Sequence, residues 1–532
     1  MAVSVGQKPA KPARGFGGAA ALVAAGILLS RLAGLIRDRV FAHFFGTSDA
    51  ADAFRAALRI PNFLQNLFGE GVLSASFIPV YASLLARGER EESGRVAGAI
   101  FAILALLTSA LVLLGVLATP ILIDGIAPGF EGAKRELTIS LVRVLFPGAG
   151  LLVLSAWCLG ILNSHRRFFL SYSVPVLWNA AMIAALLFFG PRNDQDHLAV
   201  IVAWASVGGS ALQFVAQLPV VIRLVPKLRV ALAWQLESVR VVVRNFGPVF
   251  VSRGVVQLSA YIDSLLASLL PTGAVGALAY AQTIYLLPVS LFGMSVSASE
   301  LPEMSSAVGH EAEIAEYLRK RLISGLRRIA FFVVPSAVAF LASGDLIAGA
   351  IYQGGLFHRS DAVWVWGILA GSGVGLLAST QGRLYSSAFY ALKDTRTPLR
   401  FAIVRVALTT TLGYLCAKPL PPMLGIDPKW GVAGLTASAG VSGWMEYLLL
   451  RRALSRRIGR AGVGAGYIAR LWAAALAGAA GAWAIKLSLP LLHPILTACA
   501  TLIPFGFVYL LLADPKHIRE RIASIAGNRG AI

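Results

Sequence analysis

Charged side chains embedded in apolar sequence restrict what this chain can fold into more than any other feature. They concentrate in residues 30–85, which read SRLAGLIRDRVFAHFFGTSDAADAFRAALRIPNFLQNLFGEGVLSASFIPVYASLL. Lipid tolerates charge at membrane depth only where the charge faces a protein interior or a water-filled cavity. The charges that we single out here are Arg31, Arg37, Asp38, Asp52, Arg55, Arg59 and Glu70. They predict a helical bundle with a polar interior.

The spacing of these residues places them on common helix faces. If the chain is helical from residue 49 onward, five polar side chains lie within about 60° of one line. They are Asp52, Arg55, Arg59, Asn66 and Glu70. Arg31 and Asp38, seven residues apart, also share a face of the preceding helix, with Arg37 beside them. Two adjacent spans are therefore expected to direct charge at one interior.

Composition sets the class of protein. With 57% hydrophobic and 14% charged residues and a mean hydropathy of +0.73, the chain is not an ordinary soluble domain. The formal net charge of +21 comes from basic residues in short segments between apolar spans, which argues for a membrane protein and against a nucleic-acid partner. The cysteines and histidines lack the spacing of metal ligands, so no metal site and no cofactor is expected.

Apolar segments separated by loops of alternating charge predict about fourteen transmembrane helices in an all-α polytopic fold. The expected spans are 17–45, 49–85, 96–118, 137–163, 168–190, 198–224, 246–270, 273–305, 329–351, 362–391, 398–417, 431–451, 467–488 and 491–512. Pro61 and Pro79 are expected to kink the second span. The basic connectors and two tails, 1–16 and the basic 513–532, then lie on the cytoplasmic side.

The chain contains an internal repeat. Leu67-Phe68-Gly69 with a following Ser-Ala-Ser recurs at Leu291-Phe292-Gly293, and Ser30-Arg31 recurs as Ser252-Arg253, 222 residues later. An offset of six spans keeps the orientation of the copies the same, so the repeats are parallel. They predict an N-lobe at 17–224 and a C-lobe at 246–451 around a central cavity, with 467–512 as two extra C-terminal helices.

The sign of the intramembrane charge favours an anionic ligand. Cations at Arg31, Arg37, Arg55, Arg59, Arg253 and Arg383 outnumber the acids Asp38, Asp52, Asp263 and Glu70. A cationic cavity suits phosphate, which the arginine fork binds well. The alternative is that some arginines reach the membrane surface or form structural pairs, as Arg59 with Asp52, or Arg405 and Arg470, could do.

Several long motifs resemble the MurJ/MviN lipid II flippases of the multidrug/oligosaccharidyl-lipid/polysaccharide exporter superfamily. Besides the motif at 30–85, they are IAPGF at 126–130, ILNSHRRFF at 161–169, LASLL at 266–270, YAQTIYLLPVSLFG at 280–293 and FYALKDTRTP at 389–398. The resemblance covers nearly the whole chain.

This resemblance implies a bacterial inner-membrane flippase for undecaprenyl-pyrophosphate-linked disaccharide pentapeptide, acting in peptidoglycan synthesis, cell-wall biogenesis and cell shape. It implies transport by alternating access, no catalytic residues, and a groove for the lipid tail at 467–512. It also implies substrate-binding roles for Arg31, Arg37, Asp38, Asp52 and Arg383. Partners would be the glycolipid, the bilayer and the cell-wall synthesis machinery.

The chain departs from the family pattern at three cationic positions, where it has Gln65, Asn66 and Thr283. We expect Arg55 and Arg253 to supply part of the missing positive field. Some relatives bind sodium through a seventh-helix acid, which Asp263 matches, but the eleventh span has Arg405 and no Asn or Asp. Coupling to the membrane potential or to a monovalent cation is left open.

Other function classes are less consistent with these residues. A cation or drug antiporter would need a net acidic cavity, and a polyprenyl-dependent glycosyltransferase would need paired carboxylates on a large external domain. The external connectors are short. An exporter of another polyprenyl-linked oligosaccharide, or an envelope-assembly scaffold that transports nothing, remains as an alternative.

Overall fold

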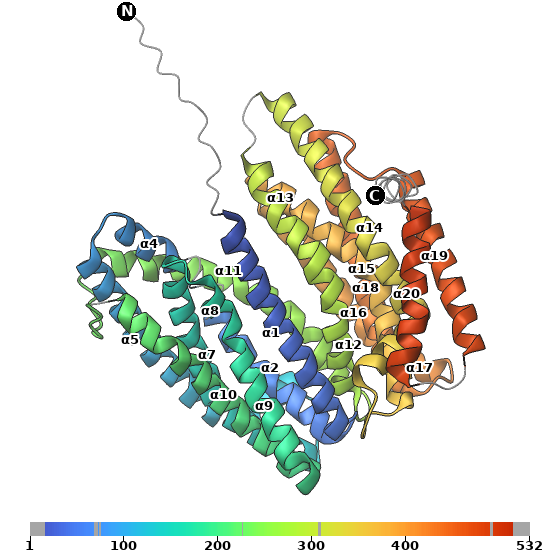
Figure 1. Cartoon of the computed structure of the whole chain (residues 1–532), viewed down its shortest axis with the longest axis horizontal. Coiled ribbons are helices and arrows are strands. Elements are labelled where there is room, and N and C mark those ends of the chain that lie inside the picture. Colours follow the sequence, from blue (N-terminus) through green and yellow to red (C-terminus); the bar gives the residue numbers. More distant parts are fainter. Residues whose placement is uncertain are drawn as a thin grey trace, which may run out of the picture. The chain divides into compact units, whose positions relative to one another are not determined.

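The computed structural model describes residues 16–68, 73, 76–225, 227–306, 310–489 and 493–513, and it is built of helices (Figure 1). Within these residues, no strand is present apart from one isolated bridge between Gly354 and Phe357. The predicted all-α fold is confirmed. Of the two predicted tails, only residues 16 and 513 fall within the described part.

The first half of the chain forms a series of mostly long helices. They are α1 (Phe16–Phe45), α2 (Asp49–Phe68), α4 (Ile78–Ala86), α5 (Arg90–Leu117), α6 (Thr119–Ile126), α7 (Gly132–Ser164), α8 (Phe168–Ser173), α9 (Pro175–Phe189) and α10 (Gln195–Leu224). A short 3₁₀ turn, η1 (Gly190–Arg192), follows α9.

The second half continues in the same way. Its helices are α11 (Glu237–Ser268), α12 (Ala274–Pro288), α13 (Ser295–Ser305), α14 (Glu311–Tyr352), α15 (Arg359–Ala391), α16 (Arg396–Ala417), α17 (Leu420–Met423), α18 (Gly431–Ile458), α19 (Ala465–Ser488) and α20 (Pro494–Ala513). A π-helical turn, η2 (Val289–Met294), joins α12 to α13, and a 3₁₀ turn, η3 (Pro428–Trp430), precedes α18.

The predicted spans each coincide with a helix or a short series of helices. Among the described residues, ten of these elements are long and apolar enough to cross a bilayer. The other four predicted spans coincide with α1, with α2 and α4, with α11 and with α18. The total of fourteen membrane crossings stays a prediction.

The second predicted span differs from the expectation. A separate helix, α4, begins at Ile78 after a turn residue at Phe77, whereas α2 is described to Phe68. Pro79 lies in the first turn of α4, where its missing N–H removes no hydrogen bond. This proline therefore starts a helix instead of kinking one, while Pro61 lies inside α2.

The chain divides into two compact units. Unit 1 comprises Met1–Arg37, Ala57–Pro120 and Ile139–Gln257, and unit 2 comprises Asp38–Ala56, Ile121–Thr138 and Leu258–Ile532. Unit 2 thus combines the end of α1 and the start of α2 with the second half of the chain. The predicted lobe boundaries at 17–224 and 246–451 remain a prediction.

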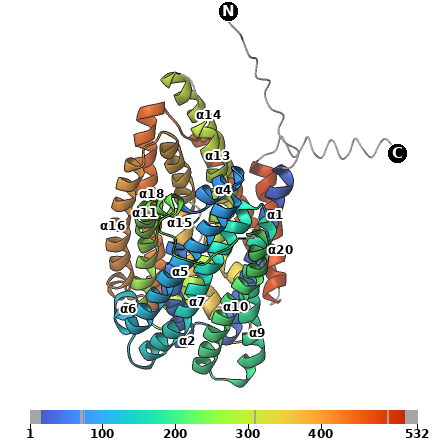
Figure 2. The same cartoon turned by 90° about the vertical axis from the view of Figure 1, so that its left-hand side faces the viewer.

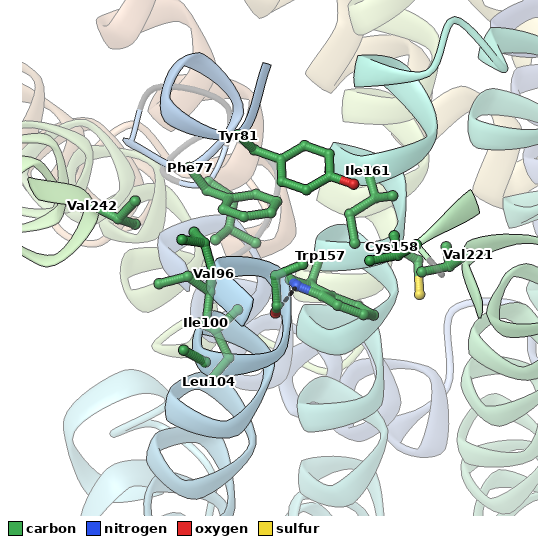
Figure 3. Close-up of a cluster of buried hydrophobic side chains, with 14 of the residues drawn as sticks. Phe77, Tyr81, Val96, Ile100, Leu104, Trp157, Cys158, Ile161, Val221 and Val242 are labelled. Carbon is green, nitrogen blue, oxygen red and sulfur yellow. Dashed lines mark hydrogen bonds between the residues drawn. The ribbon is translucent and has the colours of Figure 1, made fainter. Parts of the chain in front are cut away.

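Unit 1 has a hydrophobic core between α4, α5, α7 and α10. Phe77, Tyr81 and Trp157 are fully buried there, and Trp157 Nε1 donates to the carbonyl of Ala97 at 3.1 Å (Figure 3). Burying the indole with its N–H paired avoids the cost of an unsatisfied donor. Figure 2 shows α5, α7 and α10 running alongside one another around this core.

Unit 2 packs around α15, which lies between α14 and α18. A Cβ added to Gly375 of α15 would come within 2.3 Å of Gly440 Cα in α18, so the two backbones touch. Small residues permit this close approach in membrane bundles, where dispersion replaces the hydrophobic effect. Helices α19 and α20 pair with each other and pack on α14. Lys486 of α19 forms a 2.6 Å ion pair with Asp345 of α14.

Candidate functional site

A buried carboxylate, Asp38, lies at the centre of the polar site in unit 2. It is 2% exposed, and both of its oxygens accept hydrogen bonds from other helices. Arg55 Nη2 donates to Oδ1 and Thr283 Oγ1 donates to Oδ2, both at 3.1 Å. These bonds join α1 and α2 to α12. The expectation that Asp38 and Arg55 face one interior holds for this pair.

Aromatic rings enclose the Arg55 guanidinium. Its Cζ lies 4.6 Å from the ring centroid of Phe41 and 5.1 Å from that of Tyr280. Tyr280 donates its hydroxyl to the carbonyl of Gly46, and Tyr352 donates to the carbonyl of Tyr280. Because the rings exclude water, the attraction between Arg55 and Asp38 is stronger than it would be at the surface.

A second buried carboxylate, Asp52, accepts hydrogen bonds from the start of α12. The backbone N–H groups of Gly273 and Gly276 donate to its two oxygens at 2.8 and 2.7 Å. A carboxylate at a helix N-terminus satisfies free N–H groups and interacts favourably with the helix dipole. Gly273 has φ +89°, a left-handed conformation that favours glycine.

Lys134 completes the environment of Asp52. Its Nζ lies 2.6 Å from Asp52 Oδ2 and 2.9 Å from Asp49 Oδ1, and it sits 4.3 Å from the ring centroid of Phe130. This lysine lies between the predicted spans 96–118 and 137–163 and is not among the predicted site residues. Lys134 is thus a cation that contacts Asp52. The alternative pairing of Arg59 with Asp52 stays a prediction.

Further bonds fix the corner between α1 and α2 in unit 2. Arg39 Nη1 donates to the carbonyls of Ala350 and Ile351, both at 2.8 Å, at the end of α14. Thr47 Oγ1 donates to Asp361 Oδ1 at 2.8 Å. The corner is thus bound to α12, α14 and α15 through polar contacts, which can be broken and remade more readily than a packed apolar core.

In unit 1, Arg37 contacts α9. Its Nη1 donates to Asn179 Oδ1 at 3.1 Å, and its Cζ lies 4.9 Å from the Trp178 ring centroid. Arg31 is exposed and Arg59 is partly exposed. These predicted site residues therefore differ in environment from Asp38 and Arg55.

A third group of polar residues lies within unit 2 on α11, α12, α15, α16 and α18. Arg405 Nε is 3.3 Å from Glu446 Oε2. Arg405 thus forms an ion pair within the protein, which is the alternative given for it from the sequence. Tyr285 shares a 3.0 Å hydrogen bond with Ser379 and lies within electrostatic range of Arg383, Arg405 and Asp263. Arg383 is exposed.

The structure does not describe two of the predicted site residues. They are Glu70 and, on α11, the side chain of Arg253, so their roles stay predictions. Asn66, expected on the same stripe as Asp52, is exposed. Among the described residues, no cluster of three or more His, Cys, Asp or Glu side chains could hold a metal ion.

Comparisons with known proteins address the family. A family model described as "Lipid II flippase MurJ" matches residues 41–505. The chain belongs to the MurJ family of lipid II flippases. It is 32% identical over 437 residues to the lipid II flippase MurJ of Burkholderia cenocepacia, covering 81% of this chain and 82% of that one. A probable lipid II flippase MurJ of Rhizobium meliloti is 31% identical over 454 residues, with coverages of 81% and 79%.

Solved structures agree on the fold. A lipid II flippase MurJ in an inward closed conformation matches with a TM-score of 0.77 at 23% identity, covering 94% of this chain and 100% of that one. An inward-facing MATE family multidrug transporter of the MOP superfamily matches with a TM-score of 0.64 at 17% identity, covering 82% and 98%. Membership of a MurJ family makes the chain a multi-pass membrane transporter and not an enzyme.

Proposed function

We propose that this protein translocates lipid II from the inner to the outer leaflet of the bacterial cytoplasmic membrane by alternating access. The MurJ family match over residues 41–505 carries this proposal. The buried charges of α1 and α2 support it, because a chain without transport would gain nothing from charges held at membrane depth. Delivery of lipid II to the outer leaflet would serve peptidoglycan synthesis.

The site residues divide into two proposed roles. Arg31 and Arg383 are exposed and Arg37 is partly exposed, so we assign these three arginines to contact with the substrate pyrophosphate. The Asp38–Arg55 pair and the Asp52–Lys134 pair are enclosed by protein, and they act on conformation. They hold the α1–α2 corner against α12 in the state described here, and their release would accompany opening.

Energy coupling is a separate proposal. Transport is coupled to the membrane potential or to a monovalent cation near Asp263, without a bound cofactor. The eleventh predicted span has Arg405, paired with Glu446, and no Asn or Asp that would help Asp263 to hold a cation, which favours the membrane potential. Comparing flipping in vesicles with a sodium gradient against vesicles with a potassium diffusion potential separates the two.

The orientation is proposed with both termini in the cytoplasm, and cell-wall synthases are the proposed protein partners. The alternating charge of the connectors supports this orientation. Cysteine placed at Asn193 or Lys429 should react with an impermeant reagent from outside, and cysteine at Lys320 only from inside. Reversed labelling would contradict the orientation without affecting the family assignment.

A complementation experiment tests the function. The chain is expressed in a host whose own lipid II flippase is depleted, beside a matched Arg37→Ala variant. Growth with the wild-type chain and not with Arg37→Ala supports lipid II transport. Growth with both would favour a scaffold, and accumulation of a different polyprenyl-linked oligosaccharide inside the cell would favour the alternative substrate.

A further inference from the structure

Two helix ends in this protein carry a basic residue where the backbone favours glycine. After α7, Arg166 has φ +58°, and after α15, Lys393 has φ +59°. Within the described residues, Ala233 is the only other residue besides glycine with positive φ. A side chain with a Cβ is disfavoured in this left-handed region, so such residues point to a function that outweighs the cost.

The two turns are the same structural motif. Arg167 N donates to Leu162 O and Arg166 N to Asn163 O, while Asp394 N donates to Phe389 O and Lys393 N to Tyr390 O. This pair of bonds defines a Schellman turn, in which the left-handed position is usually glycine. The connectors occupy matching places in the internal repeat, after the fourth and tenth predicted spans.

The protein uses glycine in the same motif elsewhere. Gly88, with φ +78°, and Gly425, with φ +68°, occupy the left-handed position of Schellman turns after α4 and α17. Glycine thus occupies the left-handed position in two other Schellman turns of this chain. Arg166 and Lys393 depart from this pattern in the connectors after the fourth and tenth predicted spans, and both side chains are exposed.

Neither basic residue has a carboxylate partner among the described residues. Arg167 next to Arg166 is also exposed and without an ion pair there. Asp394, next to Lys393, is already bound to Arg457 at 2.7 Å and to Thr397. Each turn thus presents positive charge at a connector that the charge pattern places on the cytoplasmic side.

We propose that Arg166 and Lys393 form two binding sites for lipid phosphate at the cytoplasmic membrane surface, one in each of these two connectors. The ligand chemistry is a phosphate ester, supplied by an anionic phospholipid or by the pyrophosphate of the transported lipid. The fixed turn holds each side chain at the helix end, so the cation meets the headgroup layer without ordering a loop. The proposal rests on the proposed orientation, and its test does not depend on transport.

Glycine substitution separates this role from a structural one. Arg166→Gly and Lys393→Gly keep the turn and relieve the backbone while removing the charge. The purified full-length protein in detergent is titrated with phosphatidylglycerol, with phosphatidylcholine as the uncharged control, and with undecaprenyl pyrophosphate. The unfolding temperature is measured at each lipid concentration. Ala233→Gly makes the matched backbone change without a change in charge.

Both glycine variants should be at least as stable as wild type without lipid. Each should need about fivefold more phosphatidylglycerol or undecaprenyl pyrophosphate for half-maximal stabilisation, the effect of removing one surface cation. Arg166→Lys and Ala233→Gly should retain wild-type affinity. A shift with one anionic lipid alone identifies the source of the phosphate.

Three results would overturn the proposal. They are unchanged affinity for both anionic lipids in the glycine variants, equal stabilisation by phosphatidylcholine, and a loss of lipid-free stability on Arg166→Gly beyond that of Ala233→Gly. Because stabilisation by lipid is measured on the purified protein without transport, these outcomes stand apart from success or failure in complementation.

Discussion

Arg55 Nη2 lies 3.1 Å from Asp38 Oδ1, and the two side chains are 10% and 3% exposed. Burying such a pair costs desolvation free energy that the mutual attraction offsets only while both partners are present. The pair joins the end of α1 to the start of α2 inside unit 2. Its contribution is therefore best seen by removing one charge at a time.

Asp38→Ala should destabilise the protein by about 3–5 kcal/mol, because it leaves the Arg55 charge buried without its partner. Adding Arg55→Met to Asp38→Ala should recover part of that loss. Unfolding in detergent measures both effects. Arg31→Met, at an exposed position, is the control and should change stability by less than about 0.5 kcal/mol. A double variant as unstable as the sum of the single changes would show that the pair is not coupled.

The second prediction concerns the missing family arginine at position 283. Thr283 and Arg55 bind the two oxygens of the same carboxylate, so an arginine at 283 would stand beside Asp38 as well. Arg55→Ala should abolish complementation at normal membrane levels, and Thr283→Arg should restore it in the same chain. Full activity of Arg55→Ala alone would contradict the idea that Arg55 replaces the family cation.

Gly273→Ala should weaken the attachment of α12 to Asp52. A Cβ at Gly273 would lie 2.5 Å from the carbonyl oxygen of Thr47, and the residue has φ +89°. The left-handed backbone alone costs about 1–2 kcal/mol, and the clash adds to it. Gly132→Ala is the matched control, because Gly132 has φ +54° with nothing within 4 Å of the added Cβ. Equal losses of stability in the two variants would mean that the contact with Thr47 has no effect.

The sequence predicts the helical spans and the buried charges, but it does not predict which residues those charges contact. Hydropathy and loop charge locate the spans because both are local properties, and burial of Asp38, Asp52 and Arg55 follows from charge in apolar sequence. Lys134 was missed because it is 82 residues away from Asp52 in the sequence and lies in a polar connector outside the predicted spans. The start of a new helix at Ile78 was missed because Pro79 is compatible with either a kink or a helix start.

Acid should weaken the turn between α15 and α16. Hydrogen bonds from the Thr397 backbone and hydroxyl, with the Arg457 charge, lower the pKa of Asp394 below its ordinary value of 3.8. A lowered folded-state pKa contributes stability above the ordinary value and loses it as pH falls through the folded value. Wild type should therefore lose more stability than Asp394→Asn between about pH 5 and about pH 2. Parallel curves for the two proteins would exclude this contribution.

The lipid-tail groove that the family resemblance implies at α19 and α20 gives the last prediction, which compares two glycines of α19. A Cβ at Gly478 would come within 2.9 Å of the Phe505 carbonyl oxygen in α20, whereas Gly481 has nothing within 4 Å. Gly478→Leu should therefore separate the helix pair, lowering stability by about 1–3 kcal/mol or more together with transport. Gly481→Leu should fold normally. If the open side of α19 receives the lipid tail, this variant should flip a long-chain substrate several-fold more slowly and a short-chain analogue at the wild-type rate. Equal rates for both chain lengths in Gly481→Leu would place the tail elsewhere, since the added side chain would then meet no substrate.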